Sequence, residues 1–339
     1  MLVVLSLLTL AVIASNFVTL PYYAIAPGSA RPVESLVTVS DKSKAFPHRG
    51  DVLFTTVSLY RAKTFDAIQS WFDHNIQLVP EKQILGSTPP SQLNQQNLQE
   101  MSQSKDTAVN VALRRIGVPE EGKGTLVATV ENNTPAVGHL NAGDVILAID
   151  GKPTLLNQDA VAAIRSHKPG ETSQFLVQAA NGKQRTETIT YGANPATKIA
   201  FVGVTLATKD SHFDLPYNVT IDSGQVGGPS AGLAFTLEVI DTLTPGDLTA
   251  GQKVAVTGTI DEDGSVGEIG GIAQKTAAVR AAGAHYFLVP ASEAAQARKH
   301  AGKHLTIVGV KTLEDALTAL HTLGGNTQAL GPPPSSLQR

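Results

Sequence analysis

The first twenty residues are almost entirely apolar. Residues 2–20 carry no charge and are mostly Leu, Val, Ile and Ala, with Asn16 as the one strongly polar interruption. A helix of this length measures about 28 Å, close to the hydrocarbon thickness of a bilayer. The aromatic pair Tyr22-Tyr23 follows, where interfacial anchors occur in membrane proteins. The pattern predicts a transmembrane anchor over residues 1–24.

Two other interpretations of this segment stay open. Ala24-Ile25-Ala26 resembles the small-residue site at which signal peptides are cleaved. However, Pro27 stands directly after the cut, and the apolar run exceeds the roughly 7–15 residues of a usual signal-peptide core. A buried core helix is the third interpretation. No Lys or Arg precedes the run, so charge does not orient it in a membrane.

Strand and helix periods alternate over the next hundred residues. Leu36–Val39 and Asp51–Leu59 show the period of strands, and Thr64–Phe72 shows helical spacing. A long polar helix is predicted over Leu93–Ile116, with small and apolar residues on one stripe. We expect residues 34–120 to form an N-terminal α/β region that packs with the following domain.

Residues 121–196 are predicted to be mostly strands. An apolar strand ends at Val130, the Asp150-Gly151 pair predicts a tight hairpin, and Asn157–Ser166 is predicted to be a helix. The run from Leu140 to Ile146, Leu-Asn-Ala-Gly-Asp-Val-Ile, resembles PDZ domains of the bacterial protease-associated kind. The resemblance implies a PDZ-like, β-barrel-type domain over these residues.

A PDZ domain implies peptide binding by strand addition. The resemblance places a bound peptide beside Thr125–Val130, with its C-terminal carboxylate on the preceding turn. That turn comprises Gly122, Lys123, Gly124 and Thr125, which are therefore the predicted peptide-binding residues. In the alternative interpretation, the groove is closed and Lys123 is an ordinary surface lysine.

Composition excludes several classes of function. The net charge is −3 and charged residues make up 16% of the chain, so no broad basic surface indicates nucleic-acid binding. The chain has no cysteine, which excludes disulfides and cysteine nucleophiles, and the pattern predicts neither a metal site nor a cofactor. A P-loop-like run ends in Lys123-Gly124, but Gly124 stands where a Mg²⁺-binding hydroxyl is required, so no nucleotide is expected.

The serine in Gly227-Gly228-Pro229-Ser230-Ala231 is the candidate nucleophile. The glycines permit a tight turn, and the pattern predicts a helix directly after Ser230. Unpaired N–H groups at such a helix start could stabilise an oxyanion, which makes Gly228 and Ala231 candidate supporting residues. A serine hydroxyl needs a base, because it is a weak nucleophile alone.

Lys275 is the candidate base. A lysine can accept a proton if burial lowers its pKa, and the neighbours of Lys275 in the sequence are mostly apolar. Alone, Ser230 is also typical of a helix cap and Lys275 of a solvated helix residue, but their joint occurrence favours a Ser–Lys hydrolase.

Three sequence blocks resemble the Lon protease domain. They are Gly228-Pro229-Ser230-Ala231-Gly232, Thr257-Gly258-Thr259-Ile260, and the run from Gly264 to Gly283 that contains Lys275. The resemblance implies an α/β domain like ribosomal protein S5 domain 2 over residues 198–322, with Ser230 as nucleophile, Lys275 as general base and Thr257 as a supporting residue. Many Lon proteases carry an acidic residue where this chain has Gly227.

The order of segments is similar to that of membrane-anchored bacterial PDZ–Lon proteins, which lack an ATPase module. The resemblance implies an α+β multidomain protein of the cell membrane, single-pass, with its catalytic domain outside the cytoplasm. The tail 325–339 is expected to be disordered. Such a protein would be an ATP-independent serine endopeptidase that cleaves exposed segments of protein or peptide substrates selected by the PDZ groove, and it could form a hexameric ring. The alternatives are a catalytically silent PDZ scaffold and a small-molecule kinase of similar fold.

Overall fold

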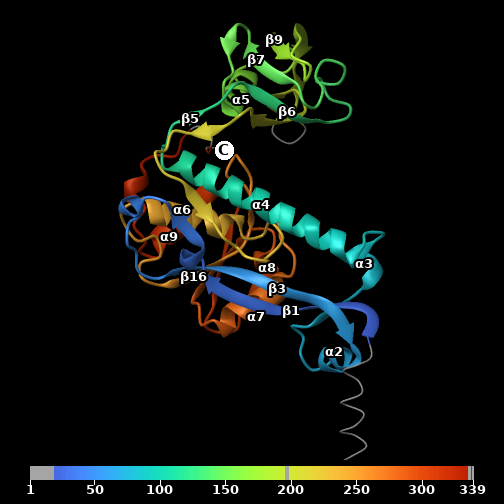
Figure 1. The fold of residues 1–339 in the computed structure, drawn as a ribbon, viewed down its shortest axis with the longest axis vertical. Helices are drawn as coiled ribbons and strands as arrows, with labels where there is room; N and C mark the ends of the chain where they lie inside the picture. The colour runs from blue at the N-terminus through green and yellow to red at the C-terminus, as the bar shows by residue number, and fades with distance from the viewer. Residues whose placement is uncertain (1–18, 195–197, 335–336, 338–339) are drawn as a thin grey trace, which may run out of the picture. The chain divides into compact units, whose positions relative to one another are not determined.

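The computed structural model describes residues 19–194, 198–334 and 337 (Figure 1). The chain divides into two compact units. Residues 117–216 form the smaller unit, and the segments on both sides of it, up to Ile116 and from Tyr217 onward, form the larger one. The smaller unit is thus an insertion in the sequence of the larger.

A six-stranded sheet is the centre of the larger unit. Its strand order is β20-β19-β16-β3-β1-β4. The strands β3, β16, β19 and β20 are parallel to one another, whereas β1 is antiparallel to both β3 and β4. The bounds are β1 Thr19–Pro32, β3 Asp51–Lys63, β4 Gln77–Pro80, β16 Lys253–Val256, β19 Tyr286–Pro290 and β20 Thr306–Val310.

Buried residues explain why this sheet forms. Leu53, Ala255, Phe287 and Val289 lie on its strands and belong to one apolar cluster with residues of the packed helices. Strands covered in this way read as nearly continuous apolar runs, as β16 and β19 do. The helices are α2 Thr64–Gln69, α3 Glu81–Leu85, α4 Pro90–Arg115, α6 Gly232–Leu243, α7 Ile272–Ala281, α8 Ala294–His300 and α9 Leu313–Thr322.

Short elements complete the larger unit. The paired strands are β2 Val37–Val39 with β15 Val219–Ile221, and β17 Thr259–Ile260 with β18 Val266–Gly267. The 3-10 helices are Glu34–Leu36, Lys42–Lys44 and Gln328–Leu330. The last one lies in the tail that the sequence pattern predicts to be disordered, and the Arg115 guanidinium donates to the carbonyl of Leu330 at 2.9 Å.

The structure corrects the expectation of a transmembrane helix at the N-terminal end of the sequence. Residues 1–18 lie outside the described residues, but Thr19–Pro32 form strand β1, so the prediction of a helix through residue 24 is wrong. Tyr23 and Ala24 are buried in the sheet by pairing with β3 and β4, which explains their apolar character without a bilayer. Among the described residues, no helix combines the length and apolarity needed to cross a membrane. The single-pass localisation inferred from that helix is therefore not supported.

The smaller unit is a second sheet with one helix. Its strand order is β10-β9-β7-β6-β13, and α5 (Asn157–Arg165) packs on β6, β7 and β13. The core contains Val127, Ile146, Ile164 and Phe175. The strands are β5 Glu120–Glu121, β6 Thr125–Val130, β7 Val145–Ile149, β8 Lys152–Pro153, β9 Thr172–Gln178, β10 Gln184–Thr190, β11 Gly192–Ala193, β12 Ala200–Phe201, β13 Val204–Thr208 and β14 His212–Phe213.

The grouping of the N-terminal segment differs from the sequence expectation. The pattern alone groups residues 34–120 with the PDZ-like domain, but β3 pairs with β16, so Asp51 lies beside Lys253. Parallel pairing across such a sequence distance leaves no local signal, because each strand carries only its own apolar pattern.

Candidate active site

Ser230 lies in the turn that enters α6. Gly228 adopts φ +87°, a left-handed conformation that favours glycine, and Ala231 caps the helix that begins at Gly232. Every residue of α6 is buried. The turn therefore presents a half-buried hydroxyl from a helix that is fixed in the core.

Lys275 lies in the first turn of α7. The helix is entered through Gly271 at φ +71°, and the Lys275 N–H donates to the carbonyl of Gly271 at 2.9 Å. A Cβ at Gly271 would lie 2.7 Å from Cγ1 of Val57 on β3, so only glycine allows α7 to approach the sheet this closely.

Three elements bring three side chains together. The Nζ of Lys275 lies 2.7 Å from Oγ of Ser230 and 3.0 Å from Oγ1 of Thr257, which follows β16. The Thr257 hydroxyl in turn donates to the carbonyl of Ser230 at 3.1 Å. Because its proton is used there, the Thr257 oxygen presents a lone pair to Lys275, and an amine N–H can point to it.

Burial sets the protonation of Lys275. Its side chain is among the largest that are fully buried, with 2% of the residue exposed, and this burial lowers its pKa to about 7. The negative charge of Glu293 acts in the opposite direction. Burial raises the pKa of Glu293 itself, whose carboxylate accepts the Ile269 N–H at 2.9 Å. The amine can therefore be neutral near pH 7 and bind a proton from a neighbouring hydroxyl.

Two backbone N–H groups beside the hydroxyl are unpaired. Among the described residues, no acceptor takes the N–H of Ser230 or Ala231. The N–H of Gly228, in contrast, donates to the carbonyl of Asn97 on α4 at 2.8 Å. Of Gly228 and Ala231, the two residues predicted to support an oxyanion through their backbone N–H groups, only Ala231 thus has a free donor.

A cavity of about 740 Å³ opens beside the dyad. Both Ser230 and Lys275 line it, together with the Gly227–Ala231 turn and residues of β1, β3, α3 and α4. Apolar side chains form one part of the wall: Ile25, Val57, Leu59, Ile84, Met101 and Ile269. An extended peptide segment with apolar side chains matches this lining.

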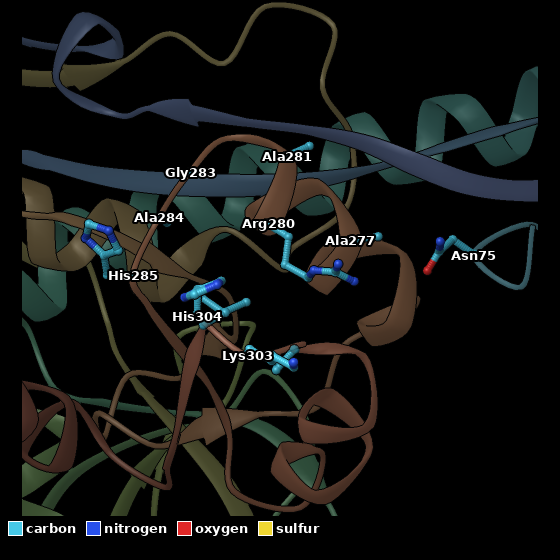
Figure 2. Close-up of a pocket in the computed structure, with 11 residues that line it drawn as sticks. Asn75, Ala277, Arg280, Ala281, Gly283, Ala284, His285, Lys303 and His304 are labelled. Atoms are coloured by element: carbon cyan, nitrogen blue, oxygen red, sulfur yellow. The ribbon is translucent and has the colours of Figure 1, made fainter.

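A second hollow of about 530 Å³ lies elsewhere in the same unit. Figure 2 shows the residues that line it, among them Arg280, His285 and His304. It shares no residue with the cavity beside Ser230. The basic side chains of this hollow therefore take no part in the candidate chemistry.

The predicted peptide-binding residues of the smaller unit are already paired. Strand β6, which contains Thr125–Val130, has β7 on one side and β13 on the other. The N–H of Lys123 donates to the carbonyl of Lys209, and the N–H of Gly124 donates to the carbonyl of Leu155. Thr125 is buried. Strand β13 pairs with β6 from Thr125 to Val130 and β7 pairs with its first residues, so a peptide strand added beside Thr125 would have to displace one of them. A Cβ at Gly122 would also clash with Thr208.

Strand β13 is the edge that the sequence interpretation missed. Of the strands that the structure describes, it pairs with β6 alone, and α5 packs against it. The preceding residues are Phe201-Val202-Gly203-Val204, with Gly203 at φ +82°. Among the described residues, the N–H groups of Val202 and Gly203 have no acceptor. In the sequence, the signal for this edge is the apolar-Gly-apolar run before the strand. It lies beyond residue 196, where the predicted PDZ-like domain ends.

Comparison with known proteins finds two families along the chain. Residues 98–190 match the PDZ domain family, and residues 195–322 match the Lon protease (S16) C-terminal proteolytic domain. The chain carries a PDZ domain and a Lon proteolytic domain. Both are mixed α/β units in the structure.

Individual relatives match parts of the chain. A Lon protease of Neorickettsia sennetsu is 30% identical over 44% of this chain and 17% of its own length, and one of Phenylobacterium zucineum is 34% identical over 32% and 14%. The chain therefore spans less than a fifth of these relatives. The PDZ domain of an SdrC-like protein from Listeria monocytogenes is 30% identical, with a TM-score of 0.24, over 25% of this chain and 87% of that one.

Proposed function

We propose that the protein is a serine endopeptidase with Ser230 as nucleophile and Lys275 as general base. The observation that carries the proposal is the 2.7 Å contact between the Ser230 hydroxyl and a buried amine whose pKa is about 7. The match to the Lon proteolytic domain supports the same chemistry.

The proposed reaction begins with proton transfer. Neutral Lys275 takes the proton of Ser230 as Oγ attacks the substrate carbonyl, and the ammonium then gives that proton to the leaving amine. Water hydrolyses the resulting acyl-enzyme by the same proton path. Thr257 accepts one N–H of the amine, which directs the lone pair of Nζ toward Ser230. The free N–H groups of Ser230 and Ala231 are the proposed donors to the oxyanion.

The proposed substrate is an unfolded or exposed peptide segment. The cavity beside the dyad is open and partly apolar, and its lining includes β1 and β3. The Lon relatives are named proteases. Another relative, from Pseudomonas fulva, is named a probable periplasmic serine endoprotease that is DegP-like. It is 38% identical over 23% of this chain and 16% of its own length.

We propose that the PDZ domain binds peptide tails along β13. A peptide would add as a strand to the open edge beside α5, and its carboxylate would accept the free N–H groups of Val202 and Gly203. In the isolated unit 117–216, a peptide with a free C-terminal carboxylate should shift the amide resonances of Val204–Thr208 and α5 in solution NMR. The same peptide with an amidated C-terminus should bind more weakly. Shifts confined to β10 at the opposite edge would contradict the proposal.

Substitution of either member of the dyad tests the catalytic proposal. Ser230→Ala and Lys275→Ala should each lower the rate of cleavage of an unfolded protein substrate by about 10⁴-fold or more, because nucleophile and base act as a unit. Ser102→Ala and Lys303→Ala, at exposed positions, are matched controls that should cleave at the normal rate. Full activity in either dyad variant contradicts the proposal. A folded native protein that binds peptide tails but cleaves nothing favours the alternative of a silent PDZ scaffold.

A further inference from the structure

A buried serine on α4 contacts the turn that carries Ser230. Ser104 is 6% exposed, and its hydroxyl donates to the carbonyl of Pro229 at 3.0 Å, across 125 positions of sequence. Serines inside helices usually face solvent or bond to a carbonyl of the preceding turn of their own helix. The bond of Ser104 to another element is therefore a specific feature of this packing.

The contact fixes one peptide plane. Pro229 and Ser230 share a planar peptide bond, so the Pro229 carbonyl and the Ser230 N–H point in opposite directions. Two donors hold that carbonyl, the Ser104 hydroxyl and the Gly232 N–H at 3.2 Å. Whatever holds the carbonyl also fixes the direction of the unpaired Ser230 N–H.

A second contact ties the same turn to α4. The Gly228 N–H donates to the carbonyl of Asn97 at 2.8 Å, and a Cβ at Gly227 would lie 2.8 Å from Cβ of Asn97. A Cβ at Gly232 would likewise lie 2.9 Å from the Ser104 oxygen. The turn thus contacts α4 at both Asn97 and Ser104, and glycines are needed for this approach.

We propose that Ser104 is a positioning residue for the oxyanion donor of Ser230. It acts by holding the Pro229–Ser230 peptide in the orientation that turns the Ser230 N–H to the oxyanion, so α4 completes the active site from outside the Lon-type segment. This inference rests on the proposed function.

The test is Ser104→Ala in the full chain. We expect kcat to fall by about 10- to 100-fold, less than the roughly 10²–10³-fold cost of removing an oxyanion donor, because the Ser230 N–H stays but is held less firmly. KM should be unchanged, because the substrate pocket is intact. The pH midpoint of the activity should also be unchanged, because Ser104 does not contact Lys275. A peptide boronate, which forms a tetrahedral adduct with Ser230, should bind more weakly by the same factor as kcat falls.

Matched variants distinguish positioning from folding. Ser102→Ala on the exposed face of α4 should leave kcat and boronate affinity unchanged. Gly227→Ala should lower kcat by pressing α4 away from the turn, and combined with Ser104→Ala it should cost less than the sum of the two effects. Labelling of Ser230 by a fluorophosphonate, carried to completion, gives the fraction of molecules with a folded active site. Dividing the rate by that fraction makes kcat refer to folded protein only.

The outcomes separate the two proposals. Unchanged kcat in Ser104→Ala, or a loss of kcat without loss of boronate affinity, overturns the positioning role while Ser230→Ala is still inactive. The positioning role is also overturned if the losses of kcat in Gly227→Ala and Ser104→Ala add up fully in the double variant. Activity that survives in Ser230→Ala overturns the proposed function itself.

Discussion

At the scale of residues, the central feature is a lysine with almost no contact to water. Removing an amine from water disfavours its charged form, and here this effect exceeds the opposing attraction of Glu293. The sequence predicts the apolar neighbours of Lys275, but not Glu293, which comes from a turn near α8. The pKa of the amine is thus set jointly by local sequence and by a distant carboxylate.

The pH dependence of cleavage follows from this pKa. Since neutral Lys275 is the proposed base, kcat/KM should rise with pH through a midpoint near 7. Glu293→Gln should move that midpoint to lower pH, because the carboxylate raises the pKa of Lys275. Gln can still accept the Ile269 N–H, so folding should be kept. Steady-state kinetics between pH 5 and 9 measures both midpoints, and a shift to higher pH contradicts the assignment.

The same burial costs stability. The pKa of Lys275 falls from 10.5 to about 7 on folding, so between these values the unfolded chain binds more protons than the folded one. The free energy of unfolding should therefore rise with pH across that range. Lys275→Met, which buries no charge, should be more stable than the native chain, with the largest gain below pH 7 and a smaller one toward pH 10. Urea unfolding at several pH values checks this, and a gain that grows with pH would contradict it.

At the scale of elements, glycines decide how closely helices approach the site. The sequence blocks around Ser230 and Lys275 predict both helices, and the structure places them at the expected points of the chain. What the blocks do not predict is α4 beside the Ser230 turn, because Ser104 and Asn97 lie in a segment that reads only as a polar helix. Residues act at this site through packing between elements, which a periodic pattern does not encode.

Gly271→Ala tests the requirement for glycine before α7. The left-handed backbone alone costs about 1–3 kcal/mol for a residue with a Cβ, and the clash with Val57 adds to it. We expect lower stability and a large loss of cleavage, because α7 carries Lys275. Gly283→Ala is the matched control, at φ +73° with no atom within 4 Å of the added Cβ. It should lose stability through the backbone alone and keep its cleavage rate, as measured by thermal unfolding and kinetics.

At the scale of the whole molecule, the larger unit is built from both ends of the chain. The Lon-type segment contains Ser230 and Lys275, but its sheet continues through β3 and β1. A resemblance to a known domain predicts the helices and strands inside its own bounds, and it predicts nothing about the strands that complete its sheet. The same limit applies to the PDZ domain, where β13 lies beyond the segment that resembles the family.

A fragment of residues 198–339 should therefore be inactive although it contains the whole dyad. Without β3, the edge of β16 and the buried side of α7 are exposed to water. We expect a low thermal stability and no labelling by a fluorophosphonate, with recovery when residues 19–116 are added in trans. The fragment 117–216 is the control and should unfold cooperatively by itself. A stable, fully active 198–339 fragment would contradict this view.

The pairing of β3 with β16 also imposes an order in time. Asp51 and Lys253 are 202 positions apart (253 − 51), so a ribosome adding roughly 5–20 residues per second needs about 10–40 s to make the second strand after the first. The inserted PDZ domain is synthesised completely within that interval and can fold first. During this interval the edge of β3 that later pairs with β16 is unpaired, and such an apolar edge is the kind of surface that chaperones cover. The serine and the lysine then meet late in synthesis, so the proposed catalytic centre forms only after most of the chain has been made.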